Sequence, residues 1–141
     1  MRADMREEID GVPMLSERMP VYVVDWGGGR LVLETSFADD HLNRAGVVHG
    51  GLVAALLDMG LAGGSYADAE EPKKWYGMTV SMTVNFLRGI GPGTVLCEAG
   101  PTGGGARTHH VEARLLNDAR EVVAAARGVV KIIERPGTAG E

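Results

Sequence analysis

One stretch, residues 43–67, constrains the fold of this chain more than any other. It reads NRAGVVHGGLVAALLDMGLAGGSYA, and from Leu52 to Leu61 every residue is apolar or glycine except Asp58. A run that is apolar on all sides is typical of a buried central helix. It is too short and too glycine-rich for a membrane span. A carboxylate in such a helix is costly unless something binds or uses it, so Asp58 is the first candidate functional residue.

The start of the predicted helix is the second candidate feature, because Gly46, Gly50 and Gly51 have no side chains that could cover the backbone there. The first turn of a helix has unpaired N–H groups and the positive end of the helix dipole. Since Gly50 has no side chain, an oxygen atom can approach these groups closely, as binding of a developing oxyanion requires. Asp58 follows about two turns later, on a roughly similar face of the helix.

Composition and charge limit the remaining classes of function. The chain has 141 residues, the size of one domain, and its net charge of −5 argues against a nucleic-acid-binding surface. The single cysteine, Cys97, excludes an intrachain disulfide, which fits a reducing compartment and predicts a cytoplasmic location. The N-terminal residues contain no apolar segment, so we expect no signal peptide.

Strand patterns lie on both sides of the central helix. They cover residues 21–24, 30–37, 78–87, 94–99, 107–116 and 121–133. The first two predict a hairpin across three glycines, and residues 100–105 predict a loop. In the third, Met78, Val80, Met82, Val84 and Phe86 share one face and polar residues the other.

This order of elements predicts an α+β fold in which one antiparallel sheet wraps around the long helix. We expect the domain to span residues 20–134, after an extension at residues 1–19 with a short polar helix near residues 2–10. Residues 135–141 are expected to be a frayed tail. One sheet cannot cover a helix that is apolar all round, so we also expect an obligate dimer or a larger assembly.

The motif Asn43-x-x-Gly46-x-x-His49-Gly50-Gly51, with Asp58 nine residues after the histidine, resembles the hotdog-fold acyl-CoA thioesterases. The resemblance is strongest to the phenylacetate-degradation (PaaI-like) branch and covers residues 20–133. It implies the hotdog fold, hydrolysis of an acyl-CoA without a metal or other cofactor, and dimers that pair into tetramers. No zinc-spaced His/Cys cluster, G-x-S-x-G elbow or Walker-type lysine is present.

The resemblance also implies roles for individual residues. Asp58 corresponds to the catalytic carboxylate, as general base or nucleophile, and the Gly50 N–H to the group that polarises the thioester carbonyl. Asn43 corresponds to a side chain that positions the carbonyl or the water, and His49 to the motif histidine near the thioester. Thr79 lies where related enzymes carry a serine or threonine that assists the water. In such dimers, Asp58 comes from one chain and Asn43 with Gly50 from the other.

Residues outside the catalytic motif are candidates for binding the substrate or its CoA portion. They are Gly51, Phe86, Arg88, Arg107 and Thr108, of which the two arginines are suited to phosphate groups. Structural alternatives stay open for each arginine, which could be an ordinary surface residue, and for Thr108, which could be an edge-strand residue. Met59 is a candidate for lining an acyl pocket, and Ala62-Gly63-Gly64 leaves room for a bulky aryl or medium-chain group.

Structural interpretations of the motif residues must be weighed as well. Asp58 could be a structural acid bonded to a neighbouring chain, Asn43 an Asx-turn residue, and His49 a group that caps or orients the loop. Thr79 lies on the polar face of its strand, where side chains are usually solvated or paired. The combined spacing of the motif favours catalysis for Asp58 and function for Asn43, and leaves His49 evenly balanced.

Two other functions compete with acyl-CoA hydrolysis. A non-catalytic acyl-CoA-binding module of the same fold would not need the set Asn43, Gly50 and Asp58 that this chain has. A hotdog hydratase would carry an aspartate and a histidine five residues apart before the helix. Here Asp40 is followed at that spacing by Ala45, which argues against the hydratase.

Overall fold

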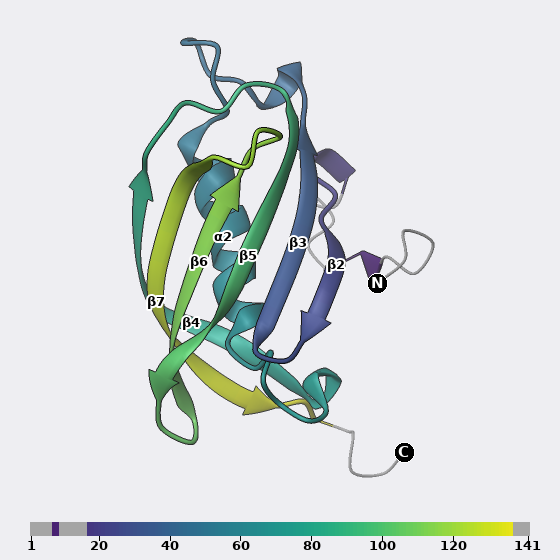
Figure 1. Ribbon diagram of the computed structural model, residues 1–141, viewed down its shortest axis with the longest axis vertical. Helices are drawn as coiled ribbons and strands as arrows, with labels where there is room; N and C mark the ends of the chain where they lie inside the picture. The colour runs from purple at the N-terminus through teal and green to yellow at the C-terminus, as the bar shows by residue number, and fades with distance from the viewer. Residues whose placement is uncertain (1–6, 9–16, 137–141) are drawn as a thin grey trace.

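The computed structural model describes residues 7–8 and 17–136 and shows a single antiparallel sheet curved around one long helix (Figure 1). The strands are β1 (Glu7–Glu8), β2 (Tyr22–Gly27), β3 (Arg30–Phe37), β4 (Trp75–Phe86), β5 (Gly93–Gly104), β6 (Thr108–Leu116) and β7 (Val122–Glu134). The helices are α2 (Gly50–Gly64) and the short 3-10 turns η2 (Asp39–His41) and η3 (Pro72–Lys74). The order of strands in the sheet is β1-β2-β3-β5-β6-β7-β4. The predicted α+β hotdog architecture is confirmed.

The central helix buries one face against the sheet. Its buried residues recur at helical spacing: Val53, Leu56, Leu57, Gly60, Leu61 and Gly64. A methyl group added at Gly60 would lie 2.5 Å from Sγ of Cys97, and one at Gly64 would lie 2.7 Å from Cβ of Ala99, both on β5. The glycines therefore allow the helix to lie close to the sheet. The opposite face of α2, which carries Asp58, is half-buried.

The expectation that Ala62-Gly63-Gly64 leaves room for an acyl group is wrong for the two glycines. The space at Gly63 is filled by Leu31, whose Cδ2 would be 2.8 Å from an added methyl group, and the space at Gly64 is filled by Ala99. These glycines end the helix and serve packing against the sheet. Ala62 is half-buried on the opposite side.

Several boundaries differ from the prediction. Strand β5 continues through residues 100–104, so the loop expected there is wrong; Gly100 and Pro101 pair with β6, and a bulge follows Pro101. Within the predicted N-terminal helix at residues 2–10, the only described residues, Glu7–Glu8, form strand β1 beside β2. The remainder of that segment, and residues 137–141 of the predicted tail, lie outside the described residues.

The strand β4 contains a bulge that changes which side chains face the helix. Thr79 pairs with Val130 of β7 and Ser81 with Val129, so Val80 is an extra residue in the strand. Before the bulge, the odd-numbered positions point inward: a side chain at Gly77 would collide with the carbonyl oxygen of Ala62. After the bulge, the even-numbered positions do.

The predicted single apolar face of this strand is therefore divided. Met82 and Val84 pack against the core, whereas Met78 and Val80 are 53% and 67% exposed. The period-2 pattern cannot reveal this change, because an inserted residue reverses the faces without altering the alternation of residue types. The bulge instead turns Thr79 toward the helix, where its hydroxyl is buried.

Candidate active site

The first turn of α2 has one N–H group that donates no hydrogen bond to any described residue. His49 is the N-cap, and its Nδ1 accepts the N–H of Gly51 at 3.0 Å. The carbonyl oxygen of His49 accepts the N–H groups of Leu52 and Val53 at 2.9 and 3.3 Å. The N–H of Gly50 has no partner among the described residues. It is therefore available to an oxygen atom of a ligand at the positive end of the helix dipole.

His49 and Asn43 both make local bonds that shape the loop before the helix. The cap on Gly51 makes Nδ1 of His49 an acceptor, which leaves the proton of a neutral ring on Nε2. Oδ1 of Asn43 accepts the N–H of Ala45 at 2.8 Å and that of Val47 at 3.4 Å, which is an Asx turn. These structural roles are observed, and direct roles of the two side chains in catalysis stay predictions.

A pocket of about 320 Å³ opens beside Gly50. Its lining residues are Asn43, Val47, Val48, Gly50, Val53, Phe86, Leu87, Arg88, Gly89, Ile90, Val123 and Ala124. The pocket thus joins four predicted site residues to apolar residues from β7 and from the connection between β4 and β5. Sequence reasoning missed the apolar lining, because residues such as Val123 and Ile90 carry no local signal that distinguishes them from other core residues.

Phe86 lines this pocket beside the start of α2. A methyl group added at Gly50 would lie 3.4 Å from Cε1 of Phe86, so the ring packs directly over the glycine at the helix start. The ring is nevertheless 58% exposed. Phe86 is therefore placed to contact a ligand bound at the Gly50 N–H.

Asp58 has no hydrogen bond or ion pair with any described residue, although it is half-buried on an otherwise apolar helix. It does not line the pocket beside Gly50. Eight residues of α-helix separate the two positions by about 12 Å along the axis. One protomer therefore does not bring Asp58 and the Gly50 N–H to the same carbonyl group.

Thr79 lies along the same helix on the facing strand. Strand β4 runs antiparallel to α2, since Phe86 packs on Gly50 at one end and Gly77 on Ala62 at the other. Interpolating between these contacts places Thr79 at the level of Asp58. The buried Oγ1 of Thr79 has no hydrogen-bond partner among the described residues. A buried hydroxyl without a partner destabilises a fold by about 1–3 kcal/mol, so this hydroxyl is a candidate for contact with a water molecule or a ligand.

We expect Thr79→Val to separate stability from activity. Valine has nearly the same shape but no hydroxyl, so removing the unpaired group should raise the melting temperature by a few degrees. If the hydroxyl assists the attacking water, kcat should fall at least about tenfold. Calorimetry and steady-state kinetics measure the two effects, with Thr79→Ser as the control that keeps the hydroxyl. A valine variant with full activity would show that the hydroxyl is not used.

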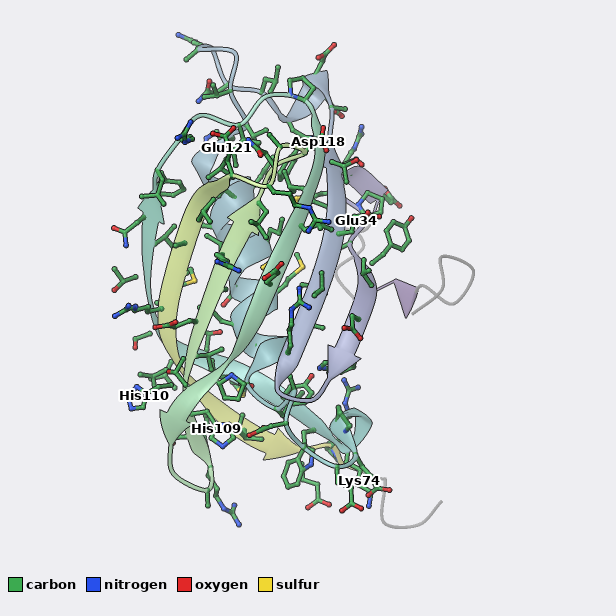
Figure 2. The ribbon with its side chains drawn as sticks, viewed as in Figure 1. Glu34, Lys74, His109, His110, Asp118 and Glu121 are labelled. Carbon is green, nitrogen blue, oxygen red and sulfur yellow. The ribbon has the colours of Figure 1, made fainter. Side chains whose placement is uncertain are left out.

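Arg107 and Thr108 lie at the other end of the protomer. They belong to the β5–β6 hairpin, next to His109, whose Nδ1 donates to the carbonyl oxygen of Ser65 just after α2. Figure 2 shows His109 and Glu121 at opposite ends of the sheet, and Glu121 adjoins the pocket through Arg88. One protomer therefore brings Arg88, but not Arg107 or Thr108, to the pocket, and their role in binding CoA stays a prediction.

A larger hollow of about 780 Å³ spans β3, β5, β6, β7 and Asn85 of β4, but contains only residues outside the predicted site. Its charged groups already pair with one another. Glu98 binds Arg30 at 3.0 Å and Arg114 at 3.1 Å, and Glu112 binds Arg127 at 3.2 Å. The smaller pocket is the better candidate site, because it combines the Gly50 N–H, which has no partner among the described residues, with apolar lining residues.

Neither an accessible cysteine nor a cluster of metal ligands is found among the residues that the structure describes. The Cys97 thiol is completely buried under Gly60, and this burial, with a smaller contribution from the nearby Glu98 carboxylate, raises its pKa to about 12. A nucleophilic cysteine requires an accessible thiolate. Within residues 7–8 and 17–136, no group of three or more His, Cys, Asp or Glu side chains is arranged to hold a metal.

A model of the thioesterase superfamily matches residues 45–124, which include the glycines at the helix start, all of α2, strands β4 to β6 and the first residues of β7. The chain belongs to the thioesterase superfamily. The predicted family and enzyme class, a thioester hydrolase, are thereby confirmed. No curated protein matches the chain significantly.

Solved structures support the same fold. A conserved protein of Pseudomonas aeruginosa, PA5202, is 27% identical, with 86% of this chain and 95% of that chain covered and a TM-score of 0.73. The PaaI protein of Escherichia coli, from the phenylacetic acid degradation operon, is 21% identical, with 86% of each chain covered and a TM-score of 0.73. A Streptococcus mutans protein, smu.793, solved with acetyl-CoA, is 22% identical over 80% of this chain and 88% of that one, with a TM-score of 0.67.

Proposed function

We propose that this thioesterase-superfamily protein hydrolyses acyl-CoA thioesters with an aryl or medium-chain acyl group, and that it acts without a metal or other cofactor. The observation that carries the proposal is the N–H of Gly50, which has no partner among the described residues and lies beside an apolar pocket that Arg88 also lines. A narrow apolar cleft suits the pantetheine arm of CoA, an arginine suits its phosphates, and an N–H at a helix start suits the thioester oxygen.

In the proposed reaction, the Gly50 N–H polarises the thioester carbonyl and stabilises the oxyanion that forms on it. Asp58 accepts a proton from water as the water oxygen forms a bond to the carbonyl carbon. The C–S bond then breaks, and the proton held by Asp58 passes to the departing CoA sulfur. The products are the free acid and CoA. In the alternative route, the Asp58 carboxylate attacks the carbonyl carbon directly, and the C–S bond breaks to give an anhydride and CoA thiolate, which takes up a proton. Water then hydrolyses the anhydride to the free acid and the Asp58 carboxylate. After a single turnover in ¹⁸O-labelled water, label in the Asp58 carboxylate would identify this second route.

The active site is proposed to form between two copies of the chain. Within one protomer, Asp58 and the Gly50 N–H are about 12 Å apart along the helix, which is too far for both to act on one carbonyl group. The exposed Met78 and Val80 on β4, which forms one edge of the sheet, provide an apolar surface for a second copy. A dimer would place Asp58 of one chain near Gly50 and Asn43 of the other, and two dimers would form the predicted tetramer.

The proposed acyl group lies beside Asp58. The helix face around this residue is half-buried and consists of small or flexible apolar side chains, Ala54, Ala55, Met59 and Ala62. Such a face, covered by a partner, leaves more room than an acetyl group needs. The proposed location is the cytoplasm, on the evidence of the single buried cysteine. In the described residues, no helix is both long and apolar enough to span a bilayer.

We expect the wild-type protein to release free thiol from phenylacetyl-, benzoyl- and straight-chain acyl-CoA esters, with kcat/KM higher for aryl or medium chains than for acetyl-CoA. A thiol-specific dye measures the release. A sharp preference for acetyl-CoA would contradict the proposed acyl class. Tight binding of these esters without any hydrolysis would instead support the alternative function, a non-catalytic acyl-CoA-binding module.

A further inference from the structure

The pocket beside Gly50 has a charged group at its rim whose partner comes from a distant turn. Nη1 of Arg88 lies 2.8 Å from Oε2 of Glu121, and both side chains are partly exposed. Arg88 lines the pocket, whereas Glu121 does not. We propose that Glu121 is a positioning residue, which holds the Arg88 guanidinium in place for a phosphate of the CoA nucleotide. This inference rests on the proposed acyl-CoA substrate.

Glu121 is itself held by the turn between β6 and β7. Its Oε1 accepts a hydrogen bond from Nδ2 of Asn117 at 3.2 Å. Oδ1 of Asn117 accepts the backbone N–H groups of Ala119 and Glu121, each at 3.0 Å, and Arg120 has a positive φ of 63°. The carboxylate of Glu121 therefore projects from a closed turn with both of its oxygen atoms bound, at the end of the sheet seen in Figure 2.

The backbone of Arg88 is fixed to the same region. The N–H groups of Leu87 and Arg88 both donate to the carbonyl oxygen of Val123 at 3.0 Å, and Val123 lines the pocket two residues after Glu121. The arginine is thus anchored at its backbone by β7 and at its guanidinium by the turn before β7. Among the described residues, Glu121 is the only ion-pair partner of Arg88.

This arrangement leaves most of the guanidinium free for a ligand. A guanidinium has five N–H donors in a rigid plane, and Glu121 is paired with Nη1 alone. The remaining donors can bind a phosphate without displacing the carboxylate. An exposed arginine otherwise loses rotamer freedom when it binds a ligand, and a preorganised side chain avoids much of that cost. Glu121 should therefore tighten binding of phosphate-bearing thioesters and leave the chemical step unchanged.

The test compares Glu121→Ala and Glu121→Gln in the 141-residue chain. We expect Glu121→Ala to raise KM for an acyl-CoA about three- to tenfold with kcat unchanged, the range expected when one side chain must be ordered on binding. Glu121→Gln keeps an oxygen acceptor for Arg88 and should restore most of the wild-type KM. With an acyl-pantetheine ester, which lacks phosphates, neither variant should differ from wild type.

Matched controls separate this role from a change in charge or stability. Glu112→Ala removes another partly exposed carboxylate, paired with Arg127 at 3.2 Å and outside the pocket, and should leave KM unchanged. In an Arg88→Ala background, Glu121→Ala should have no further effect, because the two residues act as one unit. Melting temperatures show whether the turn itself remains intact.

Three results would overturn the inference. Glu121→Ala could lower KM for acyl-CoA, which would show that the carboxylate competes with the phosphate, or it could leave KM unchanged. It could also raise KM equally for the pantetheine ester, which would show a general structural role. Calorimetric Kd values for CoA itself give the same comparison without turnover. The proposed function fails if the wild-type protein neither hydrolyses acyl-CoA nor binds CoA. Only this inference fails if the wild-type protein is active and Glu121→Ala behaves like it.

Discussion

Replacing Asp58 with asparagine is expected to reduce kcat by about a hundredfold to ten-thousandfold, the contribution of a positioned general base. Asparagine has the same shape but cannot accept a proton from water or attack the thioester. Because Asp58 has no bonding partner in the described residues and lies on an apolar helix, losing its charge should not destabilise the protein. We therefore expect an unchanged or slightly higher melting temperature together with the loss of thiol release.

Thiol release and calorimetry on the same preparation decide the role of Asp58. An active Asp58→Asn variant would show that the base is another residue. A variant that loses activity and also unfolds at a much lower temperature would favour the structural interpretation, in which Asp58 bonds to a neighbouring chain. A parallel drop in kcat and kcat/KM would show that the carboxylate acts in the transition state.

Replacing Gly50 with proline is expected to reduce kcat by about a hundredfold to a thousandfold, the usual effect of deleting one oxyanion donor. Proline has no N–H, yet it is favoured at the first position of a helix, which Gly50 occupies. His49 already has a ψ of 130°, within the range preferred by a residue before proline. The substitution should therefore delete one hydrogen-bond donor and retain the helix.

Gly50→Ala is the matched control for the proline variant. It adds a methyl group 3.4 Å from the Phe86 ring but keeps the N–H, so it isolates the steric effect of filling the space at the helix start. We expect the alanine variant to retain much more activity than the proline variant. Equal losses in both would show that the space matters and that the N–H does not.

The two inactive variants together test whether the site is shared between chains. When Asp58→Asn and Gly50→Pro chains are unfolded, mixed in equal amounts and refolded, half of the dimers should contain one chain of each kind. Each mixed dimer has one site with an intact Gly50 N–H and an intact Asp58, so about a quarter of wild-type activity should return. A site within a single protomer would give no recovery, because every chain carries one defect.

The pattern of residues in α2 was sufficient to predict much of this protein. A helix with glycines at its start, an all-apolar body and one aspartate is expected to be buried under a sheet. The His-Gly-Gly motif with its acid predicts the superfamily. Strand patterns of period 2 also located the strands to within a few residues, apart from the extension of β5. These features are local, because each depends on residues that lie close together in the sequence.

The tertiary structure decided what the candidate site contains. The bulge at Val80 depends on how β4 pairs with β7, so only that pairing shows that Thr79 faces the helix while Met78 is exposed. His49 accepts the N–H groups of Gly51, Leu52 and Val53, and only these bonds show that the Gly50 N–H is the one left without a partner among the described residues. The pairing of Arg88 with Glu121 joins two turns that are distant in sequence. Residue types and their spacing determined the helix, the fold family and the candidate acid. Hydrogen-bond partners and long-range contacts determined which groups are left available for chemistry, because these contacts depend on how the strands pair.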